Sequence, residues 1–226
     1  HLNKSINDFA EEIKTSQIIF VPGGFSGGDE PDGSAKFITS FFRNEAIKKE
    51  VTALLEEREG LMLGICNGFQ ALVKLGLVPY GKIMDTDQNC PTLTFNNIAR
   101  HQSKIVRTRV ASNKSPWLAN TKVGEVYNVA ISHGEGKFLA NEELVRELAK
   151  NGQVATQYVN LDGNATDDIR YNPNGSTFAI EGITSFDGRV LGKMGHSERI
   201  GNGLYKNVYG EYDMALFRSA VAYFKK

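Results

Sequence analysis

The chain has 226 residues, and its 26 Lys plus Arg balance its 26 Asp plus Glu, so the formal net charge is zero. That balance gives no electrostatic reason to expect nucleic acid or an anionic membrane surface as a partner. Two cysteines are too few for a disulfide framework and lack zinc-ligand spacing. No stretch approaches the ~20 apolar residues of a membrane span. We therefore predict one globular domain over residues 1–226, cytoplasmic and without a bound metal.

The N-terminal segment combines a helix signal with a strand signal. Apolar residues at helical spacing predict a helix over 5–15, with Ser5 and Asp8 placed as a capping box. The run QIIFV at 17–21 is β-branched and aromatic, which is typical of a strand covered on both faces. A loop dense in Gly, Pro and Asp follows at 22–33.

The next segment repeats this alternation of helix and strand. Helical patterning covers 34–57, with a break near Asn44. The apolar run at 61–65 predicts a second buried strand, and it leads into an amphipathic helix at 67–75 that Gly76 closes. Strands and helices in this rhythm predict an α/β sandwich whose central sheet is mostly parallel.

The second half of the chain reads as a smaller antiparallel portion. Asp187-Gly188 is a strong hairpin turn between two short strands. The last helix is expected over 209–224, and no internal repeat or linker divides the chain. Six short strands are expected within TLTFNNI, SKIVRTRV, EVYNVAISH, QVATQYVN, STFAIEGITS and RVLGKMGH.

Cys66 lies where the second buried strand gives way to a helix. With Gly64 before it and Gly68 after it, the segment has the form of a nucleophile elbow with Cys in place of Ser. A helix N-terminus lowers the pKa of a thiol, so we expect thiolate character. The amide of Asn67 and a backbone amide near Gly24 could bind an oxyanion. The alternative is a buried cysteine that acts as a small hydrophobic residue.

A cysteine nucleophile needs a proton shuttle, and His196 is the best candidate. It follows a predicted strand, and Glu198 stands two residues on, where extended backbone projects both side chains to one side. A carboxylate in that position can orient the imidazole, as the third member of a triad does. The alternative is a histidine at a strand end beside a surface ion pair.

The remaining histidines and the second cysteine give weaker signals. His133 ends another predicted strand and is followed by Gly134 and Glu135, a segment that suits either substrate contact or a structural turn. His101 is the weakest candidate. Cys90 has no glycine frame or helix N-terminus, so we predict that it is not catalytic.

Several segments together resemble a known family. PGGFS, GICNGFQ, SHGEGKF and GHSER, in that order, resemble the class I (triad) glutamine amidotransferases, which share a flavodoxin-like three-layer sandwich. Within that family, DEPDGSAKF, FNNIARHQS and NPNGS make the chain most similar to the C-terminal glutaminase domain of phosphoribosylformylglycinamidine synthases. The similarity runs over about residues 17–215, nearly the whole chain.

The resemblance implies a role for each matching residue. Cys66 would attack the side-chain amide of glutamine, form a γ-glutamyl thioester and release ammonia. His196 would protonate the ammonia and then activate water, Glu198 would orient His196, and the amides of Gly24 and Asn67 would form the oxyanion hole. The residues expected near the other end of glutamine are Phe25, Gln70, His133, Gly134 and Glu135.

The resemblance also implies a partner and contains two departures. Ammonia would pass to a synthetase, in the same or a partner polypeptide, where ATP and magnesium convert formylglycinamide ribonucleotide to the amidine in purine biosynthesis; this chain itself would need no cofactor. The family has proline where this chain has Ser197, a change we expect to be tolerated. Family members also begin with a strand, helix and strand that precede this segment, so we expect a piece of a longer synthase.

Two other interpretations stay open at this point. One is another cysteine hydrolase of the same fold, either a γ-glutamyl hydrolase or the glutaminase of a different synthetase. The other is a docking module that has lost catalysis and is retained for contact with the synthetase.

Overall fold

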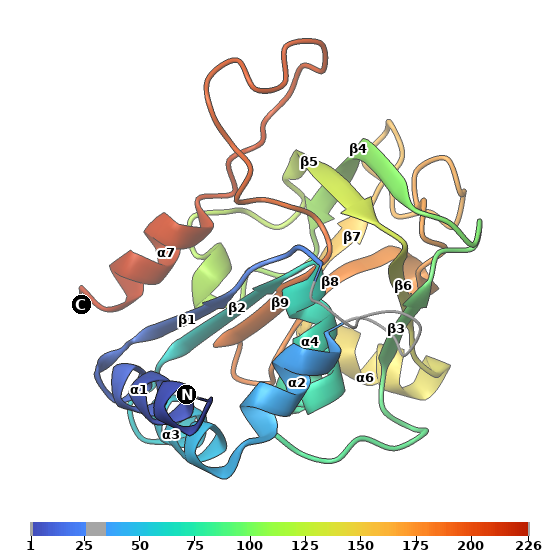
Figure 1. The fold of residues 1–226 in the computed structure, drawn as a ribbon. Helices are drawn as coiled ribbons and strands as arrows, with labels where there is room; N and C mark the ends of the chain where they lie inside the picture. The colour runs from blue at the N-terminus through green and yellow to red at the C-terminus, as the bar shows by residue number, and fades with distance from the viewer. Residues whose placement is uncertain (1, 26–34, 226) are drawn as a thin grey trace.

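The computed structural model describes residues 2–25 and 35–225, which form a seven-stranded mixed sheet with helices packed on it (Figure 1). The strand order is β1-β2-β9-β8-β7-β4-β5. The β1/β2 and β2/β9 ladders are parallel, and the ladders from β9 to β5 are antiparallel. The strands are β1 Ile18–Val21, β2 Leu61–Ile65, β4 Gln102–Val110, β5 Val126–His133, β7 Val154–Tyr158, β8 Ile180–Thr184 and β9 Val190–Lys193.

A second, two-stranded antiparallel sheet pairs β3 (Thr92–Phe95) with β6 (Glu135–Leu139). The helices are α1 Leu2–Thr15, α2 Lys36–Arg43, α3 Glu45–Glu56, α4 Asn67–Leu75, the short α5 Leu77–Tyr80, α6 Glu142–Lys150 and α7 Leu216–Tyr223, with 3₁₀ turns at Pro116–Leu118 and Thr177–Ala179. The α/β fold class expected from the sequence is confirmed, although the sheet is mixed and not mostly parallel as expected, because only the β1/β2 and β2/β9 ladders are parallel.

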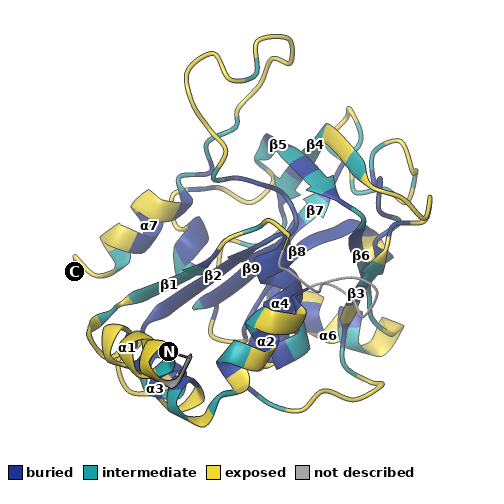
Figure 2. Ribbon diagram, viewed as in Figure 1, coloured by how far each residue is buried: buried dark blue, intermediate teal, exposed yellow. Residues whose placement is uncertain are grey.

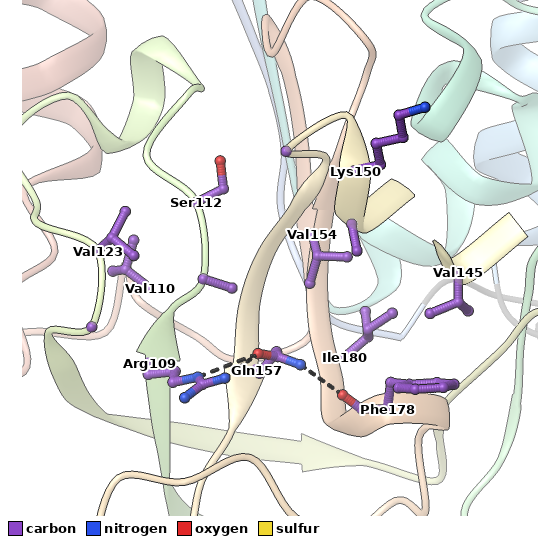
Figure 3. A pocket seen from close by; sticks show the side chains of 14 residues that line it. Arg109, Val110, Ser112, Val123, Val145, Lys150, Val154, Gln157, Phe178 and Ile180 are labelled. Atoms are coloured by element: carbon purple, nitrogen blue, oxygen red, sulfur yellow. Dashed lines mark hydrogen bonds between the residues drawn. The ribbon is translucent and has the colours of Figure 1, made fainter. Parts of the chain in front are cut away.

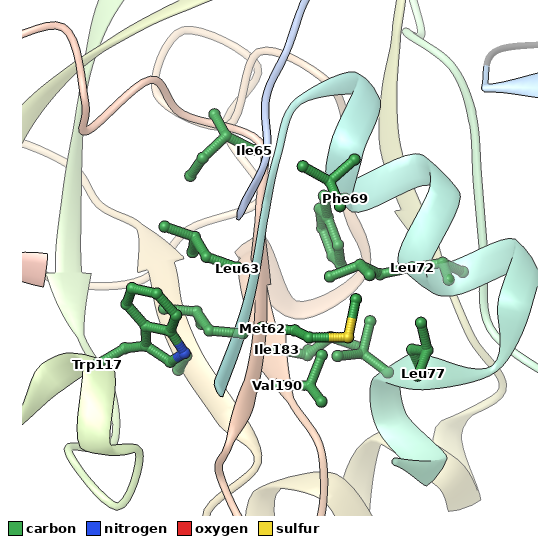
Figure 4. Packing of buried hydrophobic residues seen from close by; sticks show 14 of the residues in the cluster. Met62, Leu63, Ile65, Phe69, Leu72, Leu77, Trp117, Ile183 and Val190 are labelled. Atoms are coloured by element: carbon green, nitrogen blue, oxygen red, sulfur yellow. The ribbon is translucent and has the colours of Figure 1, made fainter. Parts of the chain in front are cut away.

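Strand β2 is the centre of the core and is buried on both faces. Its five residues are all buried, as the uninterrupted apolar run predicted. Figure 4 shows Leu63 and Ile65 pointing toward the side of Trp117, while Met62 points toward the α4 side chains Phe69 and Leu72. Helices therefore cover both faces of the parallel part of the sheet, which is the layered arrangement that such strands require.

Several expected boundaries agree with the structure. Asn44 separates α2 from α3, and its side chain accepts a hydrogen bond from the amide of Ala46, as an N-cap does. Gly76 ends α4 with a φ of 79°, and β8 and β9 are joined by the turn that contains Asp187 and Gly188. Figure 2 shows buried residues along the central strands and exposed residues along the outer helices and the long loop between β9 and α7.

Three expectations about elements are wrong. Strand β1 is less buried than expected: it lies at the edge of the sheet, and three of its four residues are half-buried. Helix α1 already includes Ser5, so that residue cannot be its N-cap. Helix α7 begins only at Leu216, because the chain before it forms the long loop. Most of the loop expected at 22–33 lies outside the described residues.

Candidate functional site

Cys66 occupies a strained turn between β2 and α4. Its backbone has φ 53° and ψ −108°, a region that residues other than glycine rarely adopt. The turn is held from both sides: the Cys66 amide donates to the carbonyl of Lys193 at 2.9 Å, and the Cys66 carbonyl accepts from the amide of Gln70 at 3.0 Å. Strain held in place by surrounding bonds is typical of functional positions.

The two flanking glycines are required by close packing. A Cβ on Gly64 would lie 2.6 Å from Cδ1 of Leu72 and 2.7 Å from the carbonyl oxygen of Gly68. A Cβ on Gly68 would lie only 1.9 Å from the carbonyl oxygen of Val21. The glycines therefore let α4 approach β1 and β2 closely, which is what places Cys66 at the carboxyl end of the parallel strands.

The Cys66 sulfur lies among backbone groups. The amides of Asn67 and Gly24 hydrogen-bond to it, and each of these bonds favours the thiolate. The thiol itself donates to the carbonyl of Ser132, with an Sγ–O distance of 3.8 Å. The two amides expected as an oxyanion hole thus converge on the sulfur.

The expectation of a lowered thiol pKa is wrong for this structure. Burial raises the pKa of Cys66 to about 11, and this effect outweighs the two amides and the nearby charge of Arg199. Desolvation disfavours a charged group more strongly than a helix N-terminus can compensate here. Cys66 is therefore a neutral thiol at rest, and a base must take its proton when it reacts.

His196 and Glu198 lie beside this thiol as a bonded pair. Nδ1 of His196 is 2.6 Å from Oε1 of Glu198, and His196 is buried. Burial acts to raise the pKa of Glu198, but hydrogen bonds from His196 and from the backbone hold it below its usual value. A Cβ on Gly23 would lie 2.6 Å from Cε1 of His196 and 3.0 Å from Cβ of Cys66, so both side chains flank that glycine.

A small pocket joins these groups. Its volume is about 70 Å³, which corresponds to about two water molecules in the liquid. That space suits a side-chain amide at the bottom of the pocket, with the rest of a substrate at its mouth. The lining residues are Gly24, Phe25, Cys66, Gln70, Ser132, His133, Gly134, Glu135, His196 and Arg199.

His133 is a buried, neutral imidazole in this pocket. Burial, with the nearby rings of His196 and His101, lowers its pKa to about 3. Neither ring nitrogen has a hydrogen-bond partner within the described part of the chain. Buried polar groups are normally bonded, so this ring is prepared to bond to something that enters the pocket.

The other residues expected near substrate also line the pocket. Nε2 of Gln70 donates to the carbonyl of Glu135 at 2.5 Å, which ties α4 to the turn between β5 and β6. Gly134 is the residue at that turn, and its carbonyl accepts from the amide of Asn96 at 2.9 Å. Phe25 is 82% exposed and lies at the rim. The structure therefore brings together every residue expected at the site, with Asn67 supplying its amide.

Sequence reasoning missed two residues at this site, Ser132 and Arg199, and ranked a third, His101, too low. The backbone of Ser132 accepts from Cys66, and its hydroxyl lies 3.0 Å from Nε2 of His101. The ring of His101 is 6.0 Å from the ring of Phe25, so the weakest histidine candidate lies at the rim. Arg199 lines the pocket with its guanidinium 3.7 Å from Glu198. The sequence could have indicated Arg199, because it directly follows the His-Ser-Glu segment. The places of Ser132 and His101 depend on strand pairing, which the sequence does not show.

Two other features of the described residues, Cys90 and a larger hollow, show no nucleophile paired with a histidine. Cys90 donates to Asp87 at 3.5 Å and lies apart from the pocket-lining residues. A larger hollow of about 540 Å³ lies between β4, β7 and α6. Two of its polar side chains bond to protein: Arg109 donates to Gln157, which donates to the carbonyl of Phe178 (Figure 3).

The described part of the chain offers neither a metal-ligand cluster nor a membrane-spanning helix. Within residues 2–25 and 35–225, no group of three or more His, Cys, Asp and Glu side chains could hold a metal ion. Over the same ranges, every helix is too short or too polar to span a bilayer.

Known proteins are similar to this chain in both sequence and fold. Residues 1–224 match the model of the CobB/CobQ-like glutamine amidotransferase domain. The chain is 36% identical over 182 residues to the phosphoribosylformylglycinamidine synthase subunit PurQ of Salinibacter ruber, covering 80% of this chain and 69% of the relative. It is 34% identical over 214 residues to PurQ of Gloeobacter violaceus, covering 94% and 82%.

Solved structures agree with these matches. The structure of PurLQS from Thermotoga maritima aligns with a TM-score of 0.68 and 26% identity, covering 97% of this chain and 92% of that chain. The glutaminase domain of Trypanosoma brucei CTPS, with bound acivicin, aligns with a TM-score of 0.51 and 12% identity, covering 97% and 75%. The second likeness concerns the fold alone.

Proposed function

The chain belongs to the CobB/CobQ-like glutamine amidotransferase family, and from this premise we propose that it is the glutaminase of a phosphoribosylformylglycinamidine synthase. It hydrolyses glutamine to glutamate and ammonia for purine biosynthesis. The observation that carries this proposal is the strained Cys66, with two amides at its sulfur and the His196–Glu198 pair beside it. We also propose that residues 1–226 act as one domain.

The first half of the reaction forms a thioester. His196 takes the proton of the Cys66 thiol as the sulfur attacks the side-chain carbonyl carbon of glutamine. The carbonyl oxygen becomes an oxyanion and accepts hydrogen bonds from the amides of Gly24 and Asn67. His196 then gives its proton to the nitrogen as the C–N bond breaks. Ammonia leaves, and the γ-glutamyl group stays on the sulfur.

The second half regenerates the thiol. His196 takes a proton from water, the hydroxide oxygen attacks the thioester carbonyl, and the same two amides hold the oxyanion. The C–S bond then breaks, glutamate leaves, and the sulfur recovers a proton from His196. Glu198 accepts a hydrogen bond from the Nδ1–H group of His196 throughout, which leaves Nε2 to exchange protons with Cys66 and with water.

The α-amino and α-carboxylate groups of glutamine would lie at the mouth of the pocket. Phe25 lies at this mouth on the segment after β1, and Gln70 lies there on α4. The segment from His133 to Glu135 closes the mouth from β5 and β6. A neutral His133 can donate from one ring nitrogen and accept at the other, which suits a polar ligand better than a second cation would.

The partner we propose is the synthetase that consumes the ammonia. Its chemistry uses ATP and magnesium in its own active site, and this chain contributes no cofactor to it. The enzyme would act in the cytoplasm, with neither nucleic acid nor a membrane as a partner. The similarity of this chain to part of the PurLQS assembly supports a partner of this kind.

The experiment compares Cys66→Ser with Cys90→Ser in the complete enzyme. Glutamine-dependent ammonia release should be lost in Cys66→Ser and retained in Cys90→Ser, while synthesis from free ammonia should persist in both. A glutamine-analogue alkylator such as diazo-oxo-norleucine should add to Cys66 and spare Cys90, as read by mass spectrometry. Labelling of Cys90 alone, or turnover without Cys66, would contradict the proposal.

The same experiment separates the alternatives. Activity that rises with the synthetase supports the proposal. Cleavage of γ-glutamyl peptides without a partner would instead point to a γ-glutamyl hydrolase. Partner binding without any turnover would point to a docking module.

A further inference from the structure

A buried ion pair lies behind the proposed active site. Lys193, at the end of β9, and Glu181, in β8, are both fully buried, with Nζ of Lys193 3.1 Å from Oε1 of Glu181. Oε2 of Glu181 also accepts a hydrogen bond from the hydroxyl of Thr156 in β7. The proposed chemistry does not use either residue, and neither lines the pocket.

The other bonds of this pair converge on residues 195–198, the triad turn, which carries His196 and Glu198. Oε1 of Glu181 accepts from the amide of Gly195 at 2.5 Å. Nζ of Lys193 donates to the carbonyl of Gly195 at 3.2 Å and to the hydroxyl of Ser197 at 2.8 Å. The pair therefore makes hydrogen bonds to the triad turn on both sides of His196, at Gly195 and at Ser197.

Lys193 also contacts the nucleophile through its backbone. Its carbonyl accepts a hydrogen bond from the amide of Cys66 at 2.9 Å. Lys193 therefore contacts both the turn that carries Cys66 and the triad turn. The charge of Lys193 is one of the influences that lower the pKa of Glu198. A shift of this side chain would move His196 relative to Cys66.

Stability alone does not explain a buried ion pair. Replacing such a pair with uncharged residues of similar size is often neutral or stabilising, because the desolvation cost offsets the attraction. What an apolar pair cannot reproduce is the set of directed bonds to Gly195 and Ser197. The hydroxyl of Ser197 gives Lys193 a second point of attachment to the turn, besides the carbonyl of Gly195.

We propose that Lys193 and Glu181 are positioning residues that hold the triad turn so that His196 faces Cys66. This inference rests on the proposed function, because it assumes that His196 transfers the proton. It predicts that the pair determines the rate of the chemical steps and not the binding of glutamine, since the turn carries the base and its orienting carboxylate. Misplacing a proton-transfer group by about 1 Å can cost about 100-fold in rate.

The test uses the complete enzyme with Lys193→Met combined with Glu181→Gln, which removes both charges and shortens the side chain at 193 by one atom only. We expect kcat for glutamine hydrolysis to fall about 10- to 100-fold, with KM for glutamine unchanged. Ammonia-dependent synthesis should be unchanged, which shows that the synthetase remains active, and the unchanged KM shows that the glutamine site of the variant is folded. The matched control is Lys14→Met with Glu11→Gln, an exposed pair of the same type at 2.5 Å, which should leave kcat unaltered.

Ser197→Ala provides a second variant that leaves the charges in place. It removes one of the bonds from Lys193, and we expect kcat to fall about three- to tenfold with KM unchanged. An unaltered kcat in the double variant, or a change confined to KM, would overturn the inference. If the double variant does not fold, an unaltered kcat in Ser197→Ala overturns it. Equal ammonia release by wild type and Cys66→Ser would instead overturn the proposed function.

Discussion

At the scale of single residues, Cys66 combines a backbone conformation that is rare for residues other than glycine with a thiol that is protonated at rest. Its positive φ projects the sulfur from the strand end, while its burial keeps the proton in place. The carbonyl of Ser132 accepts that proton's hydrogen bond at rest. The backbone therefore positions the sulfur before substrate arrives, and the thiol loses its proton only when His196 takes it.

The raised thiol pKa predicts how Cys66 reacts with a small neutral alkylator such as iodoacetamide. Because only the thiolate reacts, the labelling rate should rise about tenfold per pH unit from pH 7 to 9 without reaching a plateau. Mass spectrometry of the Cys66 peptide over time measures this rate. A plateau already reached at pH 7 would mean that a thiolate exists at rest.

A substitution at Gly23 tests how far the rate depends on the position of His196 relative to Cys66. In Gly23→Ala the new methyl group would lie 2.6 Å from Cε1 of His196, so the ring must move, and kcat should fall about 100-fold. Gly201→Ala is the control, since a Cβ there meets nothing within 4 Å, and its steady-state rates should match wild type. Equal activity in the two variants would show that the ring tolerates displacement.

At the scale of elements, the close approach of α4 to β1 is what places the cysteine turn. In Gly68→Ala the new Cβ would lie 1.9 Å from the carbonyl oxygen of Val21, and a backbone atom cannot rotate away. We expect the free energy of unfolding to fall by about 3 kcal/mol, as overpacking does. Urea unfolding measures this change. A loss below about 0.5 kcal/mol would mean that α4 shifts freely.

Elements near Cys66 were predictable because their signals are local. The apolar run of β2, the helix break at Asn44 and the Gly76 end of α4 each depend on a few neighbouring residues. The edge position of β1 was not predictable, because an apolar strand looks the same whichever neighbours it has. Strand β6 was missed because it follows β5 after a single residue, Gly134.

At the scale of the whole molecule, long-range packing determines the site properties that the sequence did not reveal. The Cys66–His196–Glu198 set followed from motifs, but the sign of the Cys66 pKa shift depends on how deeply the folded chain buries the thiol. The place of His101 at the rim similarly requires the β4–β5 register, in which Gln102 pairs with His133. The spacing of residues along the sequence does not show how deeply the fold buries a given side chain.

Buried His133 predicts how acid acts on the whole fold. Its folded pKa is about 3, while an unfolded histidine has a pKa of about 6.5. Below pH 6.5 the unfolded state therefore binds a proton that the folded state does not, and the free energy of unfolding should fall by up to about 1.4 kcal/mol per pH unit. Urea unfolding between pH 6.5 and 5 should show this slope, which His133→Gln should reduce. Equal slopes would contradict it.

The concealment of the Cys66 sulfur has a consequence for cells under oxidative stress. Peroxide attacks thiolates and converts them to sulfenic acid. A site that keeps its sulfur protonated until a ligand arrives presents little of the reactive form. We therefore expect peroxide to oxidise Cys66 slowly in the resting enzyme.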